Sequence, residues 1–436
     1  MKKVLIITYY WPPGGGAGVQ RWVKFVKYLQ QFNWEPIVYT PSNAEFPEID
    51  NSYLKDIPDN IMVLKTPIKE PYTFYKSFIG QKKEVKISTG FLTEQKKKKL
   101  SEKISVWIRG NFFIPDAKMF WIKPSVKFLR SYLSENPVDA IVSTGPPHSL
   151  HRIASKISKQ LQIPWLADFR DPWTNIDFYK DLMLMKFADR KHHKMELDVL
   201  KTASSITVIS NSMREDFLKI HPAPIEVVTN GYDKDDYECT DDIKLDDKFS
   251  IAHVGTIAKS RNPVLFWECL NELVAENDKF AEALEIKIIG KADISVWEAI
   301  NKAKLREYIV KIDHVPHNEA IMLQRKSQVL LLSINDTPNT KSILTSKFFE
   351  YMAAERPILC IGPKGGDAEK IINETACGYF SAFGDKEMLK NQIRTLFIKY
   401  RENNLYIESK NIEKYSRKEL TRRMAHLLDG ITDKIH

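Results

Sequence analysis

The residues best suited to bind or transform a ligand lie where short apolar runs end. A glycine-rich loop at 14–18 follows the apolar run 4–8 and precedes a segment with helical periodicity. Glycines there let backbone N–H groups approach a ligand, and the start of a helix favours negative charge. Gly15 and Gly16 are therefore expected to contact a phosphate or a sugar, and Arg21 to face either the binding cleft or solvent. A tight turn without a ligand is the alternative.

Two more segments in the first half carry polar side chains after apolar runs. A rigid Ser-Thr-Gly-Pro-Pro turn presents His148, and the segment Ala-Asp-Phe-Arg-Asp-Pro-Trp holds Asp168, Arg170 and Asp171. Ligands of open α/β sheets bind outside the carboxyl ends of the strands, so His148 and Asp171 are candidates for substrate contact. The alternatives are a histidine that caps a helix and an ion pair between Asp168 and Arg170.

The second half repeats this arrangement. Gly255 and Thr256 follow an apolar run at 250–254, and Arg261 comes shortly before the next helix. These residues would lie at the carboxyl end of a strand, where a backbone turn and a cation are suited to a phosphate.

A second candidate phosphate site lies at the start of a later helix. Thr345 and Ser346 would supply hydroxyls and free N–H groups there, and Lys347 would add a cation, with a solvated lysine as the alternative. Glu350, just over one turn further, would reach sugar hydroxyls beside that phosphate.

The candidate residues follow short apolar runs, and segments long enough to form helices separate these runs. Runs this short and continuous are typical of parallel strands covered by helices on both faces. Their alternation with helices predicts two Rossmann-like, doubly wound parallel-sheet domains. The runs are 4–8, 37–39, 140–143, 165–168 and 206–209 in the first half, and 250–254, 286–289, 329–333 and 358–361 in the second.

The composition of the chain predicts its domain limits. The first domain is expected at 1–235, with a basic insertion at about 72–121 that interrupts the alternation. A highly charged linker follows at 236–248, and the second domain at 249–405. The remainder, 406–436, holds an amphipathic helix that is expected to pack back on the first domain.

Composition and spacing exclude several classes of protein. The 436 residues are 43% apolar and lack the roughly 18 consecutive apolar residues of a membrane span. Four scattered cysteines fit neither a disulfide scaffold nor a zinc finger, and they suit a reducing cytosol. Val19 stands where a dinucleotide fingerprint requires its third glycine. The net charge of +9 comes from residues 72–130, with 14 Lys or Arg against four Asp or Glu, which indicates an anionic partner.

Taken together, these segments resemble the retaining glycosyltransferases of family 4, over nearly the whole chain. The resemblance implies the GT-B fold, in which two Rossmann-like domains face a central cleft. Members carry two glutamates eight positions apart; Glu350 matches the second, which holds ribose hydroxyls, whereas Ser342 replaces the first. At the family's Arg and Lys positions for the diphosphate stand Thr256 and Arg261, and Lys347 is expected to supply the missing charge.

The resemblance also implies the reaction and its partners. A sugar would pass from a nucleoside-diphosphate sugar to a hydroxyl of a glycan or polyprenyl-diphosphate-linked acceptor in cell-surface polysaccharide synthesis. Arg261 and Lys347 would stabilise the leaving diphosphate, while His148 and Asp171 would contact the sugar or the acceptor. No cofactor and no metal ion are expected, since protein cations replace the metal and the one Asp-x-Asp lies in the linker region.

Other interpretations remain open at this point. The same fold could serve a sugar-nucleotide epimerase or a non-catalytic sugar-nucleotide binding protein. Nucleic acid is not an expected partner, because the basic segment lacks the aromatic alternation of a base-stacking sheet. A cytoplasmic protein is expected, either free or peripheral on the anionic inner face of the membrane through the aromatics and lysines of 72–121. A solvated lysine-rich loop is the alternative for that insertion.

Overall fold

The computed structural model describes residues 1–46, 49–69, 100–238 and 243–433, which form two compact units. Of these residues, 1–46, 49–69, 100–229 and 417–433 belong to the N-terminal unit, and 230–238 and 243–416 to the C-terminal unit. The chain therefore passes between the units after Thr229 and again after Ser416. Residues 72–99 of the expected basic insertion lie outside the described residues.

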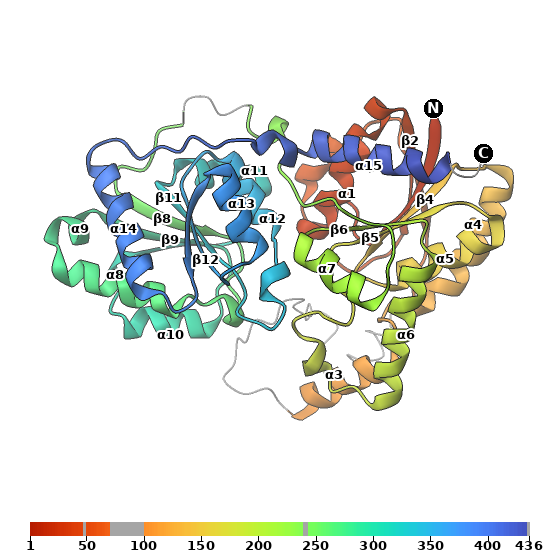
Figure 1. Cartoon of the computed structure of the whole chain (residues 1–436), viewed down its shortest axis with the longest axis horizontal. Helices are drawn as coiled ribbons and strands as arrows, with labels where there is room; N and C mark the ends of the chain where they lie inside the picture. The colour runs from red at the N-terminus through yellow and green to blue at the C-terminus, as the bar shows by residue number, and fades with distance from the viewer. Residues whose placement is uncertain (47–48, 70–99, 239–242, 434–436) are drawn as a thin grey trace. The chain divides into compact units, whose positions relative to one another are not determined.

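The N-terminal unit is built on a seven-stranded parallel sheet with the order β3-β2-β1-β4-β5-β6-β7 (Figure 1). The strand order reverses beside β1, as in a doubly wound fold. The strands are β1 (Lys2–Ile7), β2 (Trp34–Pro41), β3 (Met62–Thr66), β4 (Ala140–Gly145), β5 (Trp165–Phe169), β6 (Ser205–Val208) and β7 (Ile225–Val227).

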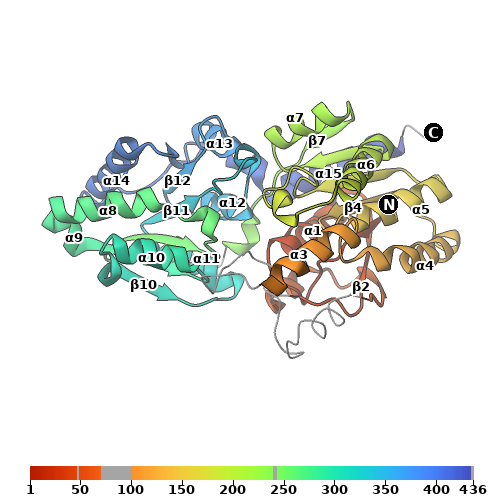
Figure 2. The ribbon, with the colours of Figure 1, turned by 90° about the horizontal axis from the view of Figure 1, so that it is seen from below.

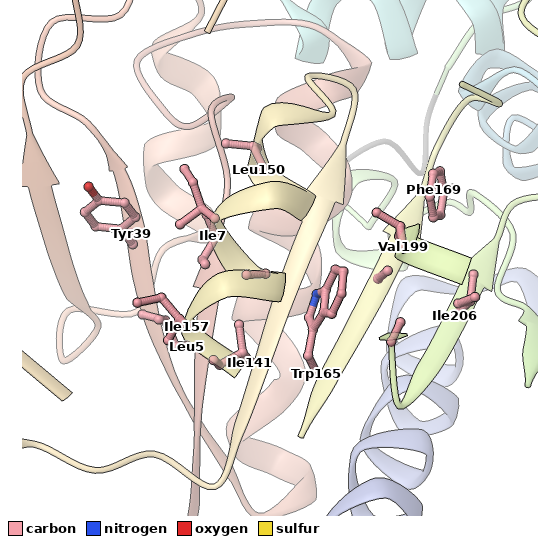
Figure 3. Packing of buried hydrophobic residues seen from close by; sticks show 14 of the residues in the cluster. Leu5, Ile7, Tyr39, Ile141, Leu150, Ile157, Trp165, Phe169, Val199 and Ile206 are labelled. Carbon is pink, nitrogen blue, oxygen red and sulfur yellow. The ribbon is translucent and has the colours of Figure 1, made fainter. Parts of the chain in front are cut away.

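Helices cover both faces of this sheet, because the central strands are apolar on both sides. On one face, side chains such as Leu150 and Ile157 of a helix pack on Leu5, Ile141 and Trp165 of the strands (Figure 3). The helices of the unit are α1 (Ala17–Leu29), α3 (Leu100–Phe112), α4 (Ile122–Glu135), α5 (Ser149–Leu161), α6 (Lys186–Thr202), α7 (Asn211–Ile220) and α15 (Arg417–Thr432).

The last helix completes the core of the N-terminal unit. The helix α15 runs beside α1 (Figure 1). Leu420, Met424 and Leu428 of α15 are fully buried and share a core cluster with Val19 and Trp22 of α1. The spacing of these residues puts them on one face of the helix, which explains why the C-terminal segment folds against α1.

The C-terminal unit has a six-stranded parallel sheet with the order β10-β9-β8-β11-β12-β13. Its strands are β8 (Phe249–Val254), β9 (Leu284–Ile289), β10 (Ile309–Ile312), β11 (Val329–Ser333), β12 (Ile358–Gly362) and β13 (Gly378–Ala382). The prediction of two doubly wound parallel-sheet domains is therefore confirmed.

Two helix layers enclose this second sheet (Figure 2). One layer contains α8 (Val264–Glu276), α9 (Asp278–Ala283), α10 (Ile294–Lys302) and α14 (Lys386–Arg401). The other contains α11 (His317–Lys326), α12 (Ser346–Ala353) and α13 (Asp367–Thr375). Within the described residues, no helix is both long and apolar enough to span a membrane.

Candidate functional site

In the C-terminal unit, the loop after β8 leaves space for a lysine from α12. Gly255 has a φ of +102°, and a Cβ there would stand 2.6 Å from both Cε and Nζ of Lys347. Gly290, with a φ of +110°, packs its backbone against that of Gly255. Only glycine combines this backbone conformation with room for the lysine chain.

The ammonium of Lys347 is held by two acceptors at the end of β8. Its Nζ lies 3.2 Å from His253 Nε2 and 3.2 Å from the carbonyl oxygen of Thr256. His253 Nδ1 lies 3.0 Å from the carbonyl oxygen of Leu331, which can only accept, so Nδ1 carries the ring proton. His253 Nε2 therefore accepts from Lys347, and the histidine orients the lysine.

This position is unfavourable for an ammonium group. Burial, with a further contribution from the nearby Arg261 guanidinium, lowers the pKa of Lys347 to about 7. Burial and the charge of Lys347 hold the pKa of His253 well below its ordinary value, so that ring is neutral. A bound anion would relieve the penalty on the charged lysine, since an opposite charge favours the ionised form.

The start of α12 adds hydrogen-bond donors beside the lysine. The helix begins at Ser346 with Thr345 as N-cap, and no side chain caps its first turn. The Oγ1 of Thr345 is buried and has no hydrogen-bond partner among the described residues. Backbone N–H groups at such a helix start are suited to an anion.

Arg261 and Glu350 complete the group in the C-terminal unit. Arg261 Nε donates to Asn335 Oδ1 at 2.5 Å, which orients the guanidinium. Glu350 follows Ser346 by one turn, and its Oε2 lies 3.5 Å from Nε2 of the buried Gln324. The structure thus gathers the predicted residues of this unit around the end of β8 and the start of α12: Gly255, Thr256, Arg261, Thr345, Ser346, Lys347 and Glu350.

In the N-terminal unit, the glycine loop opens α1 beside the end of β5. Gly16 is the N-cap with a φ of +88°, and Gly15 and Gly16 are both accessible. A Cβ at Gly18 would lie 2.8 Å from Nη1 of Arg170, so the loop and the segment after β5 meet there. Gly15 and Gly16 are placed where a ligand can reach their backbone.

Arg21 has neither of the two environments expected from the sequence. It is fully buried and pairs with Asp168 across 2.7 Å, and it also donates to the carbonyl oxygens of Val228 and Thr229. Burial opposes ionisation of Asp168, but Arg21 keeps the pKa of that carboxyl below its usual value. Assigning Arg21 to donor binding is therefore a wrong inference: its guanidinium holds an internal carboxylate.

The expected pairing of Asp168 with Arg170 is replaced by other contacts. Asp168 also accepts from Thr144 Oγ1 at 2.9 Å, whereas Arg170 donates to Thr144 Oγ1 at 3.1 Å and to the carbonyl oxygen of Pro146. Burial lowers the pKa of Arg170, and the charge of Asp171, the next residue, which is exposed, opposes part of that lowering. Asp171 is thus the accessible carboxylate of this segment.

His148 is held by an aromatic stack. Its ring lies parallel to Trp173 with centroids 4.4 Å apart, and it is only 7% exposed. As the N-cap of α5 it makes no side-chain capping bond, so the helix-cap alternative does not apply. Burial and the neighbouring His151 hold the pKa of His148 well below its ordinary value, so the ring is neutral.

Several solved structures with little sequence identity share this architecture. A mutant of S. aureus TarM, in complex with fondaparinux, α-GlcNAc-glycerol and UDP, gives a TM-score of 0.56 at 12% identity, over 98% of this chain and 100% of that one. WaaG, a glycosyltransferase involved in lipopolysaccharide biosynthesis, gives 0.54 at 13% identity, over 99% and 98%. A putative UDP-N-acetylglucosamine 2-epimerase from Listeria monocytogenes gives 0.57 at 12% identity, over 99% and 97%.

The likeness extends over nearly the whole of each chain, and in this chain it includes both doubly wound parallel-sheet units. The chain has the GT-B fold. Comparison of the sequence itself finds no matching protein family and no matching curated protein. The GT-B assignment therefore rests on the architecture.

Three side chains of the GT-B units were not among the candidates from sequence. His253 orients Lys347, and Asn335 orients Arg261. His151 packs its ring close to that of His148, with centroids 5.8 Å apart. The spacing of His151 three residues after His148, on one helix face, is a signal that could have identified it. No comparable sequence signal exists for His253 or Asn335, because their partners are distant in the chain.

Proposed function

We propose that this GT-B protein is a retaining glycosyltransferase of the family 4 type, which moves a sugar from a nucleoside-diphosphate sugar to an acceptor hydroxyl. The observation that carries the proposal is the position of Lys347. It is a cation with a lowered pKa, held beside Arg261 and the start of α12 at the carboxyl end of β8. Open α/β sheets bind ligands at that end, and the group is suited to a diphosphate.

The chemistry requires such a group because negative charge grows on the diphosphate as the glycosidic bond breaks. Cations and N–H groups already in place stabilise that charge without reorganisation, and loss of one such contact typically costs about 3 kcal/mol. We assign this role to Arg261, Lys347 and the backbone of Thr345 and Ser346. Since these cations neutralise the diphosphate, we also propose that no metal ion is required, and activity should then survive EDTA.

The remaining residues are assigned by their surroundings. We assign Glu350, one turn into α12, to the ribose hydroxyls, and the backbone at Gly255 and Thr256 to the diphosphate. In the N-terminal unit, Gly15 and Gly16 are assigned to the donor. His148 is assigned to the sugar or the acceptor, and the exposed Asp171 to a hydroxyl of the acceptor.

We place the reaction in cell-surface polysaccharide synthesis, with a glycan or polyprenyl-diphosphate-linked acceptor. Two neighbours support this: TarM was solved with UDP and a glycan, and WaaG takes part in lipopolysaccharide biosynthesis. A lipid-linked acceptor favours a cytoplasmic protein that binds the inner face of the membrane. Exposed apolar side chains of the N-terminal unit are consistent with such contact: Ile104, Phe112, Phe120 and Phe187.

The test is a thermal-shift and calorimetric screen of nucleoside-diphosphate sugars against the full chain. We expect one donor to raise the melting temperature of the wild type and of Lys302→Met, a control at an exposed lysine of α10. Lys347→Met should lose about two orders of magnitude in affinity, the equivalent of one charged contact. Equal donor affinity in Lys347→Met and wild type would overturn the proposal.

An epimerase is the competing activity, because one neighbour is a putative UDP-N-acetylglucosamine 2-epimerase. The two reactions differ in their need for an acceptor. A glycosyltransferase leaves the donor sugar unchanged until an acceptor is added, whereas an epimerase converts it alone. Incubation of the identified donor without acceptor, followed by NMR of the sugar, therefore decides between them.

A further inference from the structure

Two buried histidines in the N-terminal unit each have a ring nitrogen without a hydrogen-bond partner among the described residues. These atoms are Nδ1 of His148 and Nε2 of His151. Both flank Gly145, where a Cβ would stand 3.0 Å from the first atom and 2.4 Å from the second. The two nitrogens therefore lie next to the same point at the end of β4. Buried polar atoms in native proteins nearly always have a partner, so this pair requires an explanation.

A chain of hydrogen bonds from the core determines which nitrogen of His151 carries a proton. Trp165 Nε1, which can only donate, lies 2.8 Å from Ser143 Oγ. The same hydroxyl lies 2.8 Å from His151 Nδ1, which is the one acceptor for its hydrogen within the described residues. Ser143 thus donates to His151 Nδ1, and the proton of a neutral His151 ring is on Nε2.

We propose that His151 Nε2–H is linked to His148 Nδ1 through one water molecule, which donates to His148 Nδ1 and so fixes the tautomer of His148. With Nδ1 occupied as an acceptor, the proton of the His148 ring is on Nε2. The order of donation is then Trp165, Ser143, His151, the water molecule and finally His148. His151 is a positioning residue in this arrangement.

The surroundings of both rings are consistent with this assignment. Burial lowers the pKa of His151 to about 3, and the pKa of His148 is also lowered by burial, so both rings are neutral near pH 7. The stack on Trp173 fixes the plane of His148, and Trp173 itself donates from Nε1 to His192 Nδ1 at 3.0 Å. The ring of His148 can therefore adjust its tautomer more readily than its orientation.

The consequence for catalysis rests on the proposed function. A His148 ring with its proton on Nε2 presents a donor to the substrate. It can hydrogen-bond to an oxygen of the sugar or the acceptor, but it cannot take a proton from the acceptor hydroxyl at that atom. The inference therefore excludes His148 Nε2 as a general base.

Nitrogen-15 NMR of the full chain with labelled histidine tests the proposal without substrate. The His148 signals, assigned by comparison with His148→Gln, should show a single Nε2–H tautomer, and Nδ1 should show the shift of an accepted hydrogen bond. His151→Phe should lose that shift and give two tautomers in exchange. His151→Gln, which retains an N–H donor, should restore the wild-type signals, and the exposed His193→Gln should leave them unchanged.

A proton on Nδ1 of His148 in the wild type would overturn the proposal, as would an unchanged Nδ1 signal in folded His151→Phe. If His151→Phe fails to fold, the wild-type tautomer and the signals of His151→Gln still decide. The NMR samples contain neither a nucleoside-diphosphate sugar nor an acceptor substrate. Failure of this test is therefore distinguishable from failure of the proposed sugar transfer.

Discussion

Lys347 and Arg21 are both cations near the start of a helix, yet the fold gives them opposite environments. The ammonium group of Lys347 lies at the end of β8, where its partners are the neutral ring of His253 and the carbonyl oxygen of Thr256. Arg21 is enclosed with the carboxylate of Asp168. The residue types and spacing could indicate a cation near each glycine-bearing loop. They could not indicate burial, because the partners of Arg21 are Asp168 and the carbonyl oxygens of Val228 and Thr229, all distant in the sequence.

The binding of a nucleoside-diphosphate sugar should depend on pH through Lys347. The ligand-free pKa of about 7 means that the lysine is charged below pH 7 and increasingly neutral above it. A sugar diphosphate binds the charged form, so affinity should fall as the pH rises through 7 to 9, by at most about tenfold per unit. Calorimetry in buffers of different ionisation enthalpy should detect proton uptake on binding at pH 8.

The matched control for this pH effect is Lys347→Arg. Its guanidinium stays charged over the whole range, so affinity should be nearly constant between pH 7 and 9. A wild-type affinity that is equally flat, with no proton uptake, would contradict the assigned role of Lys347.

Replacement of Arg21 should affect stability. In Arg21→Met, the carboxylate of Asp168 stays buried without its cation, which typically costs about 3–5 kcal/mol. Urea denaturation should show that loss, and the double variant Arg21→Met/Asp168→Asn should recover part of it. Normal stability together with weakened donor binding would return Arg21 to the donor site.

At the scale of elements, the central strands could be predicted from the sequence and the edge strands could not. The strands without a predicted counterpart are β3, β7, β10 and β13, which are the two edges of each sheet. Edge strands have one neighbour and are partly exposed, so their sequences lack the continuous apolar run that marks a strand buried on both faces. The candidate residues of the site could be located from the sequence because they follow the ends of central strands.

The loop that joins β8 to the short helix η6 (Lys259–Arg261) can be tested by replacing its glycine. Gly255→Ala introduces a Cβ at a φ of +102°, 2.6 Å from Lys347 Nζ. Backbone strain of this kind costs about 1–3 kcal/mol. Displacement of the lysine should also weaken donor binding, by up to the roughly two orders of magnitude expected for Lys347→Met. Thermal denaturation and calorimetry would measure the two effects separately.

Gly365→Ala is the control for strain alone. Gly365 has a φ of +75° and nothing within 4 Å of a Cβ. This variant should lose stability but bind the donor as the wild type does. If both alanine variants bind normally, the space at Gly255 has no role in binding.

At the scale of the whole molecule, the sequence indicated two α/β domains and a last helix with one apolar face. The structure has two units, and α15 supplies part of the core of the N-terminal one. The change of unit after Thr229 could not be located from composition, because the charged segment that suggests a linker begins several residues later. The excess of positive charge in residues 72–130 is also a property of the whole molecule, because it would determine which surface the protein binds.

Substitution of lysines 96–99 by glutamine tests the proposed membrane contact, although these residues lie outside the described part of the chain. Each lysine near an anionic surface contributes about 1 kcal/mol. The variant should therefore sediment much less with phosphatidylserine vesicles and still transfer sugar to a soluble acceptor. Equal loss of both activities would refute the membrane role.

A crystal structure of the chain with a bound nucleoside-diphosphate sugar is the most direct test of the central claim. We predict that the diphosphate oxygens lie within hydrogen-bond distance of Lys347 Nζ and of the backbone N–H groups at the start of α12, with ribose hydroxyls at Glu350. A diphosphate bound elsewhere on the chain, with Lys347 still directed at His253 and Thr256 alone, would contradict the account.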